Sequence, residues 1–124
     1  MTIESLKFIN KKLEENNINY EFMQWNKDIV YPYFVGEYQE AESLNEDGLQ
    51  ESTFILTGFS KGSWLNLEQA KEKIEKIFNS VTVILPSGNA MAVFYSGSLV
   101  VPTGDAELKR IQINLAIKEW KVIE

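Results

Sequence analysis

The chain has 124 residues, an apolar fraction of 44%, a formal net charge of −6 at pH 7, and neither cysteine nor histidine. The two missing residue types exclude disulfides, zinc sites built on thiolates, cysteine nucleophiles and every histidine-dependent triad. The acidic excess argues against sequence-specific nucleic-acid binding, and no apolar run reaches the roughly 18–20 residues of a bilayer span, so we expect neither sequence-specific nucleic-acid binding nor a membrane partner.

The segment from Thr2 to about Asn16 is predicted to form a helix, the first element of a single domain that spans residues 1–124. Its apolar residues share one stripe at helical spacing: Ile3, Leu6, Ile9 and Leu13. Thr2 can cap this helix, and Asn16-Asn17 can end it because asparagine tolerates the left-handed conformation. The segment has no continuous hydrophobic region, so we expect no secretory signal and a chain that stays in a cytoplasm until it is assembled into something larger.

Two segments rich in aromatic and branched residues follow, 20–26 and 29–40, and both are predicted to be strands. Pro32 has no backbone donor, which places it at a strand start or on an edge, and Gly36 indicates a bulge or a close approach by another backbone. The acidic turn 41–48 resembles a calcium loop only superficially, because the alternating oxygen ligands and flanking helices of an EF-hand are missing. We expect this turn to be a solvated or partner-facing hairpin loop.

Residues 50–58 form the next predicted strand, and the loop 58–63 after it lacks the GxxxxGK[ST] order of a phosphate-binding loop. A helix is predicted from Asn66 to about Asn79, because Asn66 and Gln69 have capping-box spacing ahead of an apolar stripe. Shorter strands and turns follow, with strands predicted at 81–85, 91–95 and 99–101, and turns at 86–89, 96–98 and 102–105.

The final segment, Glu107 to Val122, has the longest strict alternation in the chain. One side carries Ile111, Ile113, Leu115 and Ile117, and the other carries Gln112, Asn114, Ala116 and Lys118. This is the period of a strand with one buried and one wetter face. The predicted order is therefore α-β-β-β-α-β-β-β. Because two amphipathic helices can cover only one face of such a sheet, we predict an α+β two-layer sandwich, with both helices on one face of a mainly antiparallel sheet.

Catalytic chemistry has little support in this sequence. The available acid/base material is a set of carboxylates around the acidic turn: Glu37, Glu40, Glu42, Glu46 and Glu51. A charge run in a loop is usually a solvated loop, whereas an acid/base pair needs one carboxyl in an apolar pocket and another in water. A ligand-stacking pocket could use Trp25, Tyr31, Tyr33, Tyr38 and Trp64, although core and interface positions are commoner for aromatic residues. We therefore predict no catalytic residue, no cofactor and no metal.

An interaction surface is better supported. Trp120 lies among charged residues near the end of the final strand, and an aromatic residue on a wet strand face often belongs to a protein–protein contact. The candidate interaction residues are Glu42, Glu46 and Asp47 of the acidic turn, together with Gln112, Asn114, Lys118 and Trp120 of the final strand.

Three stretches carry a resemblance to a known class of proteins: IVYPYFVGEYQE at 29–40, EDGLQESTFILTGFSKGSWLNLEQAKEKIEKIF at 46–78, and LKRIQINLAIKEWKV at 108–122. They give a tyrosine- and proline-rich strand, an acidic turn, an FxLTG-like strand, a helix, and a long closing strand that ends near a tryptophan. In this layout, over nearly its whole length, the chain resembles the small tail completion or tail terminator (head–tail joining) proteins of long-tailed phages and Gram-positive prophages. The shared residues are structural rather than reactive.

The resemblance implies a non-enzymatic virion protein at the head-proximal end of the tail tube. Such proteins end tube polymerisation and present a surface for head attachment, often as a hexameric ring. The implied partners are further copies of the chain, the tail tube protein and a head completion protein. The implied location is the host cytoplasm during assembly and then the head–tail interface of the virion, where an acidic chain would suit a lumen through which DNA slides.

The alternative interpretation is a small acidic inhibitor or immunity-type protein that masks a basic nuclease or toxin. Its support is the net charge of −6 together with the acidic turn, which would steer association with a basic partner. Charge reversal at Glu42, Glu46 and Asp47 would then slow capture of that partner. A small enzyme or ligand-binding module has less support, because histidine and cysteine are missing.

Overall fold

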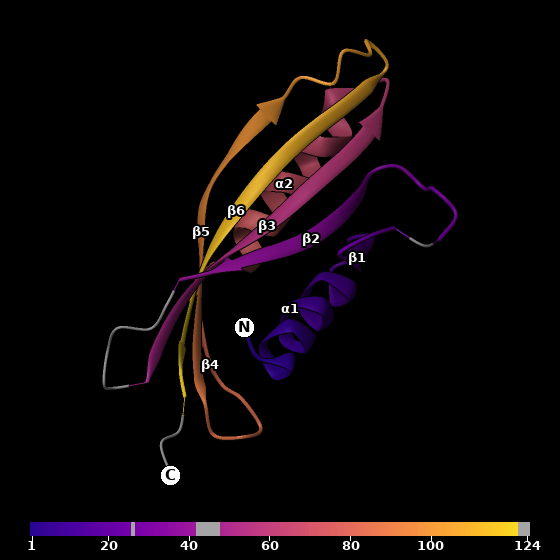
Figure 1. Cartoon of the computed structure of the whole chain (residues 1–124). Helices are drawn as coiled ribbons and strands as arrows, with labels where there is room; N and C mark the ends of the chain where they lie inside the picture. Colours follow the sequence, from indigo (N-terminus) through magenta and orange to yellow (C-terminus); the bar gives the residue numbers. More distant parts are fainter. Residues whose placement is uncertain (26, 42–47, 122–124) are drawn as a thin grey trace.

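A computed structural model describes residues 1–25, 27–41 and 48–121. It has two helices and six strands in the order α-β-β-β-α-β-β-β, which confirms the predicted α+β class (Figure 1). The elements are α1 (Ile3–Glu15), β1 (Tyr20–Phe22), β2 (Tyr33–Glu40), β3 (Leu49–Lys61), α2 (Trp64–Ile77), β4 (Asn79–Ile84), β5 (Ala90–Val101) and β6 (Leu108–Trp120).

The six strands form one curled sheet in the spatial order β1-β2-β3-β6-β5-β4. Its centre is the antiparallel pair of β3 and β6, which stay in register from Leu49↔Trp120 to Lys61↔Leu108. All other pairs are also antiparallel except β1 with β2, which is parallel. The longest alternating segment of the sequence therefore lies in the middle of the sheet.

Strand β5 corrects one prediction from the sequence, because the turn expected at 96–98 does not break the strand. Residues 90–101 form one strand, and its register against β6 shifts between Tyr95 and Ser98. Gly97, with φ of 113°, lies in this irregularity. A β-bulge absorbs the extra residue and lets pairing resume, so glycine and serine mark a bend in the strand rather than a turn.

Helix α1 begins as predicted, with Thr2 as its N-cap and Thr2 Oγ1 accepting a hydrogen bond of 3.2 Å from the Ser5 amide. Its buried stripe differs from the predicted one. Ile9 and Leu13 are fully buried, whereas Ile3 is 73% exposed and the small Ser5 is buried in the first turn. Leu6 and Phe8 are partly buried against the same core, so only the first turn departs from the predicted stripe, and it makes polar contacts.

Helix α2 begins earlier than predicted. Ser63 is its N-cap, and Ser63 Oγ accepts a hydrogen bond of 3.1 Å from the Leu65 amide. Asn66, the predicted cap, is an exposed residue inside the first turn. Leu67, Ala70 and Ile74 form the buried stripe of this helix, so its apolar face was predicted from the sequence although its start was not.

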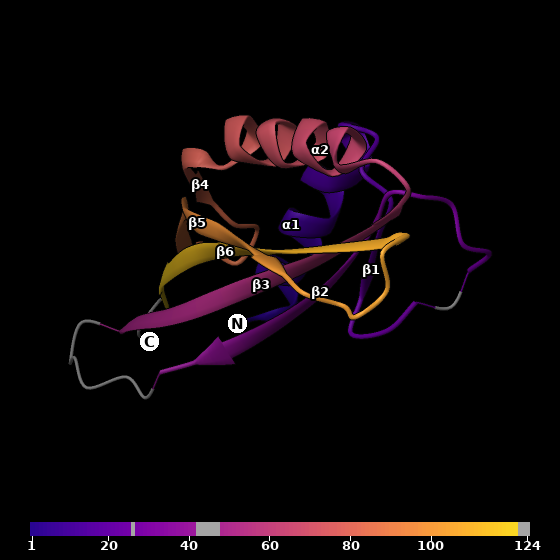
Figure 2. The ribbon, with the colours of Figure 1, turned by 90° about the horizontal axis from the view of Figure 1, so that it is seen from above.

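Both helices lie on the same side of the sheet (Figure 2). The predicted inner face of β6, formed by Ile111, Ile113, Leu115 and Ile117, is buried there with exposed fractions of at most 1%. These residues share one cluster with the stripes of α1 and α2. The prediction of a two-layer sandwich with one helical layer is confirmed.

Gly36 and Gly58 lie on this inner face, where aromatic rings replace the side chain that each glycine lacks. A Cβ atom at Gly58 would lie 2.3 Å from Phe34 Cε1, and one at Gly36 would lie 2.7 Å from Tyr20 Cε1. The sequence indicated a bulge or a neighbouring backbone at Gly36. The residue is instead in regular register with Leu56, and the close neighbours are side chains.

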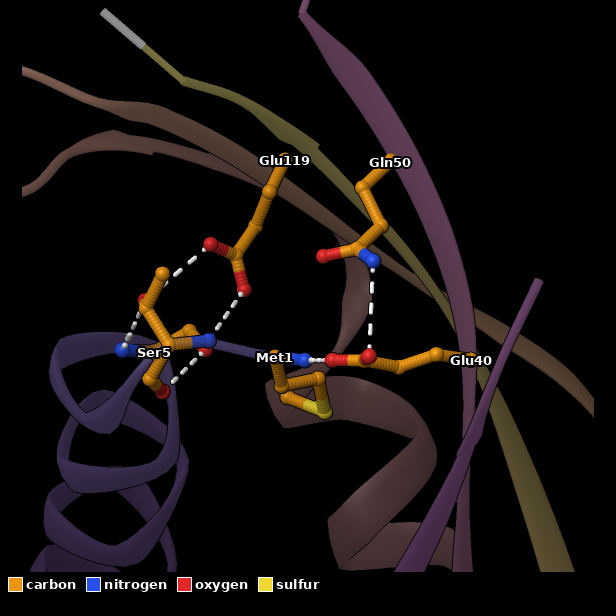
Figure 3. Close-up of polar contacts among 6 residues, drawn as sticks. Met1, Ser5, Glu40, Gln50 and Glu119 are labelled. Carbon is orange, nitrogen blue, oxygen red and sulfur yellow. Dashed lines mark hydrogen bonds and ion pairs between the residues drawn. The ribbon is translucent and has the colours of Figure 1, made fainter. Parts of the chain in front are cut away.

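A polar cluster connects the start of the chain to the far end of the sheet (Figure 3). Glu119 is 1% exposed, and its carboxylate accepts hydrogen bonds from the Thr2 amide (3.2 Å) and the Thr2 hydroxyl (3.0 Å). Beside it, Glu40 pairs with the Met1 ammonium and accepts a bond of 3.4 Å from Gln50 Nε2. Burial lowers the pKa of the Met1 ammonium, the nearby Glu119 charge acts against this shift, and Lys121 adds to it.

Candidate interaction surface

Neither of the helices that the structure describes, α1 or α2, lies on the second face of the sheet. Directly opposite residues of paired strands share a face, so the register identifies its side chains. On this face each side chain of β6 lies in a row between a residue of β3 and, for most rows, a residue of β5. In the order β6, β3, β5 the rows are Trp120, Leu49, Ala90; Lys118, Glu51, Ala92; Ala116, Thr53, Phe94; Asn114, Ile55; and Gln112, Thr57, Leu99. The rows continue onto β2, for example at Tyr33 and Glu37, and onto β4 at Ile84, and we call the whole of this face the uncovered face.

All four interaction residues predicted on the final strand lie on the uncovered face. Gln112, Asn114, Lys118 and Trp120 are each half-buried by their neighbours in the sheet. Gln112 Nε2 donates a hydrogen bond of 3.1 Å to Asn114 Oδ1, which fixes two amide side chains in the middle of the face. Lys118 lies opposite Glu51 and Trp120 lies opposite Leu49, so the end of the face near the β2–β3 connection is both charged and aromatic.

The other three predicted residues, Glu42, Glu46 and Asp47, lie outside the described residues. The strand ends that flank them are described. The Ala41 amide donates to the Glu51 carbonyl at 3.0 Å, so β2 and β3 remain paired where the acidic segment begins. Glu40 and Glu51 then project from opposite faces, because Glu40 pairs with buried Ser52 while Glu51 pairs with Lys118 on the uncovered face.

An aromatic cluster occupies the opposite end of the uncovered face. The Tyr33 ring centroid lies 5.1 Å from that of Phe59, 4.8 Å from that of Trp25 and 5.7 Å from that of Tyr31. Burial raises the pKa of Tyr33, and Tyr31 adds to the shift. Lys27 Nζ lies 5.9 Å above the Trp25 ring, a cation–π distance.

Only part of the predicted aromatic set is in this cluster. Tyr38 is on the helical side, where it stacks on Phe22 at 6.1 Å, and Trp64 is on α2 with Lys109 Nζ 5.6 Å above its ring. The sequence analysis missed Phe59, which reaches Tyr33 only through the register of β2 with β3. It also missed Ile84, Phe94 and Leu99, large apolar side chains that are exposed on the β4–β5 half of the uncovered face.

Glu37 and Glu51 are too far apart to form an acid/base pair. Glu37 and Glu51 share the uncovered face, but Glu37 lies opposite Ile55, four residues along β3 from Glu51. At about 3.4 Å per residue the two backbone positions are about 14 Å apart, beyond the roughly 5–9.5 Å between glycosidase carboxyls. A shallow hollow of about 350 Å³ is lined by Glu51 but not by Glu37, and Lys118 and Gln39 also line it.

Residues 1–25, 27–41 and 48–121 contain no group of three or more carboxylates placed to hold a metal ion. Neither α1 nor α2 is long and apolar enough to cross a membrane.

Comparison with models of known protein families gives no match. A search of curated proteins finds no relative at a significant level.

Proposed function

We propose that this chain is a head–tail joining protein of a long-tailed phage or prophage, of the tail terminator or tail completion class. In this role it has no catalytic activity. Copies form a ring on the head-proximal end of the tail tube, end tube polymerisation and present a surface for head attachment. The proposal takes its class from the layout of the strands, the acidic turn and the closing strand near Trp120.

The uncovered face is the observation that favours an assembly role. It extends over five strands and combines a central amide pair with an aromatic cluster at one end and Trp120 at the other. Exposed aromatic side chains beside polar groups are typical of protein–protein contacts, and tryptophan, tyrosine and arginine are the residues that most often dominate their energetics. The net charge of −6 suits a ring through which DNA passes, because it does not attract phosphates.

The test is the behaviour of the protein with purified tail tubes. Molecular mass is measured by light scattering as concentration rises, with and without tubes, and tube ends are viewed by negative-stain electron microscopy. We expect caps on tube ends and tubes that no longer elongate. We expect Lys118→Glu and Trp120→Ala to weaken end binding by roughly tenfold or more, as interface hot spots do.

Glu72→Lys is the matched control, because it reverses one exposed charge on α2, on the side away from the uncovered face. It should leave capping unchanged. Circular dichroism confirms that each variant is folded, and Lys118→Glu keeps the test valid if loss of the tryptophan unfolds the chain. A protein that stays monomeric and never decorates tube ends would rule out the proposed function.

A further inference from the structure

Strand β4 is an edge strand whose second half carries little protection. It is the last strand of the sheet on its side, so one row of its backbone groups has no strand partner. Natural edge strands are usually protected by lysine, proline, a bulge or a covering segment. Asn79–Ile84 has neither a charged residue nor a proline, and its one irregularity is confined to the start, between Asn79 and Val81.

The β4 strand ends in an apolar exposed side chain, whereas Val81 and Val83 are half-buried and Asn79, Ser80 and Thr82 are polar. Ile84 is 68% exposed, and Phe94 of the neighbouring strand is exposed on the same face. In a chain with a net charge of −6, an uncharged strand is a place where another copy can approach without like-charge repulsion. We call Asn79–Ile84 the β4 edge.

A second exposed apolar segment lies at the opposite edge of the sheet, in the connection between β1 and β2. Residues 28–30 have no regular secondary structure, and Ile29, Val30 and Tyr31 are exposed. The Asn19 side chain holds this connection in place, since its Nδ2 donates to the Val30 and Pro32 carbonyls at 3.4 and 3.3 Å. We call residues 28–31 the donor segment.

Charge also distinguishes the two surfaces. A hollow of about 350 Å³ opens beside Val81, where the ends of both helices meet the β4 edge, and three of the described residues that line it are Lys12, Lys73 and Lys76. The donor segment begins with Asp28, an exposed acid directly before Ile29. An acidic end on one surface and a basic hollow on the other are complementary.

We propose that copies of this chain join head to tail, with the donor segment of one copy adding as an extra strand to the β4 edge of the next. The inference rests on the ring of the proposed function and names the surfaces that close it. In this contact Asp28 of one copy lies at the lysine-lined hollow of the next copy. The donor segment therefore runs parallel to β4, and its Tyr31 lies level with Ile84 of the neighbouring copy. The two surfaces differ and lie at opposite edges of the sheet. The contact is therefore heterologous, and it closes into a ring or extends as a filament.

The chain has no cysteine, which allows a clean cross-linking test. The double variant Val30→Cys/Ile84→Cys is treated with a short bis-maleimide and analysed on denaturing gels. Heterologous contacts should give a ladder of several covalent species. Each single variant alone should give no dimer above background, and a mixture of the two singles should stop at a dimer.

Leu65→Cys/Ile84→Cys is the matched control. The exposed fractions of Leu65, Val30 and Ile84 are 62%, 59% and 68%, so random collisions would label all three to a similar degree. Asp28→Lys in the Val30/Ile84 background should lower the cross-linked fraction several-fold. Asp105→Lys, which makes the same charge change in an exposed loop away from the hollow, should leave it unaltered.

Two results from the control variants would overturn the inference. One is a control ladder as strong as that of the Val30/Ile84 pair. The other is efficient dimerisation of Ile84→Cys alone, because that would mean that β4 meets β4 across a two-fold axis. Tube capping by the unreacted double variant separates the two proposals. Capping without the ladder keeps the proposed function and removes this interface, whereas the ladder without capping does the reverse.

Discussion

At the scale of single residues, packing on the inner face of the sheet changes the pKa of one ionisable group, the Tyr20 hydroxyl. The Tyr20 ring lies against Gly36, where an added Cβ atom would be 2.7 Å from Tyr20 Cε1, and its centroid is 6.4 Å from that of Phe54. Burial raises the pKa of the Tyr20 hydroxyl well above its ordinary value of 10, and the neighbouring Glu21 charge adds to the shift.

This shift predicts a loss of stability in alkali. Above about pH 10 the unfolded tyrosine releases its proton while the folded one keeps it, so the unfolded state binds fewer protons and the free energy of unfolding falls as pH rises. The contribution of Tyr20 is up to about 1.4 kcal/mol per pH unit. Tyr20→Phe should make the decline shallower between pH 10 and 11, as measured by urea unfolding.

The two proteins should show parallel stability curves from pH 7 to 9, where tyrosine is protonated in both states. Tyr33→Phe is a useful comparison, because the pKa of Tyr33 is also raised by burial but its ring lies on the uncovered face. A Tyr20→Phe variant that keeps the full wild-type slope above pH 10 would show that this hydroxyl titrates equally in the folded and unfolded states.

At the scale of elements, the start of α2 depends on Ser63. The Ser63 hydroxyl oxygen accepts from the Leu65 amide, and loss of such a cap costs about 0.5–2 kcal/mol. Ser63→Ala should therefore lower the free energy of unfolding by about 1 kcal/mol in urea. Asn66→Ala should be neutral or slightly stabilising, because alanine is the better helix former inside a first turn. An equal cost for the two substitutions would contradict the assigned helix start.

The elements also show what the sequence can specify. The alternation of residues 111–117 and the stripe Leu67–Ala70–Ile74 each have a single period, so strand, helix and inner face were predictable. The start of α2 was not, because Asn66 with Gln69 satisfies the capping-box pattern as well as any true cap. Neither was the continuity of β5, because Gly97 and its serine neighbours have the composition of a turn whether the chain turns or bulges.

The uncovered face was predictable for one strand only. Alternation assigned Gln112, Asn114, Lys118 and Trp120 to it, since that pattern is local. The aromatic cluster and the β4 edge depend on which strands are neighbours and in which register, and one sequence does not specify either. Phe59 and Tyr33 illustrate this limit, because 26 positions separate them in the sequence and they meet only through the pairing of β2 with β3.

At the scale of the whole molecule, two carboxylates connect α1 to distant parts of the sheet. Glu119 near the end of β6 binds Thr2, and Glu4 accepts from the Ser87 amide (2.8 Å) and hydroxyl (2.6 Å) in the β4–β5 turn. Glu119 also places negative charge at the helix N-terminus, where the macrodipole favours it. These bonds hold the first helix across the inner face, between the last strand and an edge hairpin.

Loss of the Glu119 contacts should therefore loosen α1 before it affects the sheet. A hydrogen bond to a charged group contributes about 1.5–3 kcal/mol, so Glu119→Gln should lower the free energy of unfolding by an amount in this range. Hydrogen exchange should show faster exchange of α1 amides with little change at the centre of β3 and β6, because those strands keep their partners. Glu15→Gln is the control, since Glu15 is an exposed residue at the other end of α1. Equal acceleration in α1 and in the central strands would mean that Glu119 supports the whole core rather than the docking of the first helix.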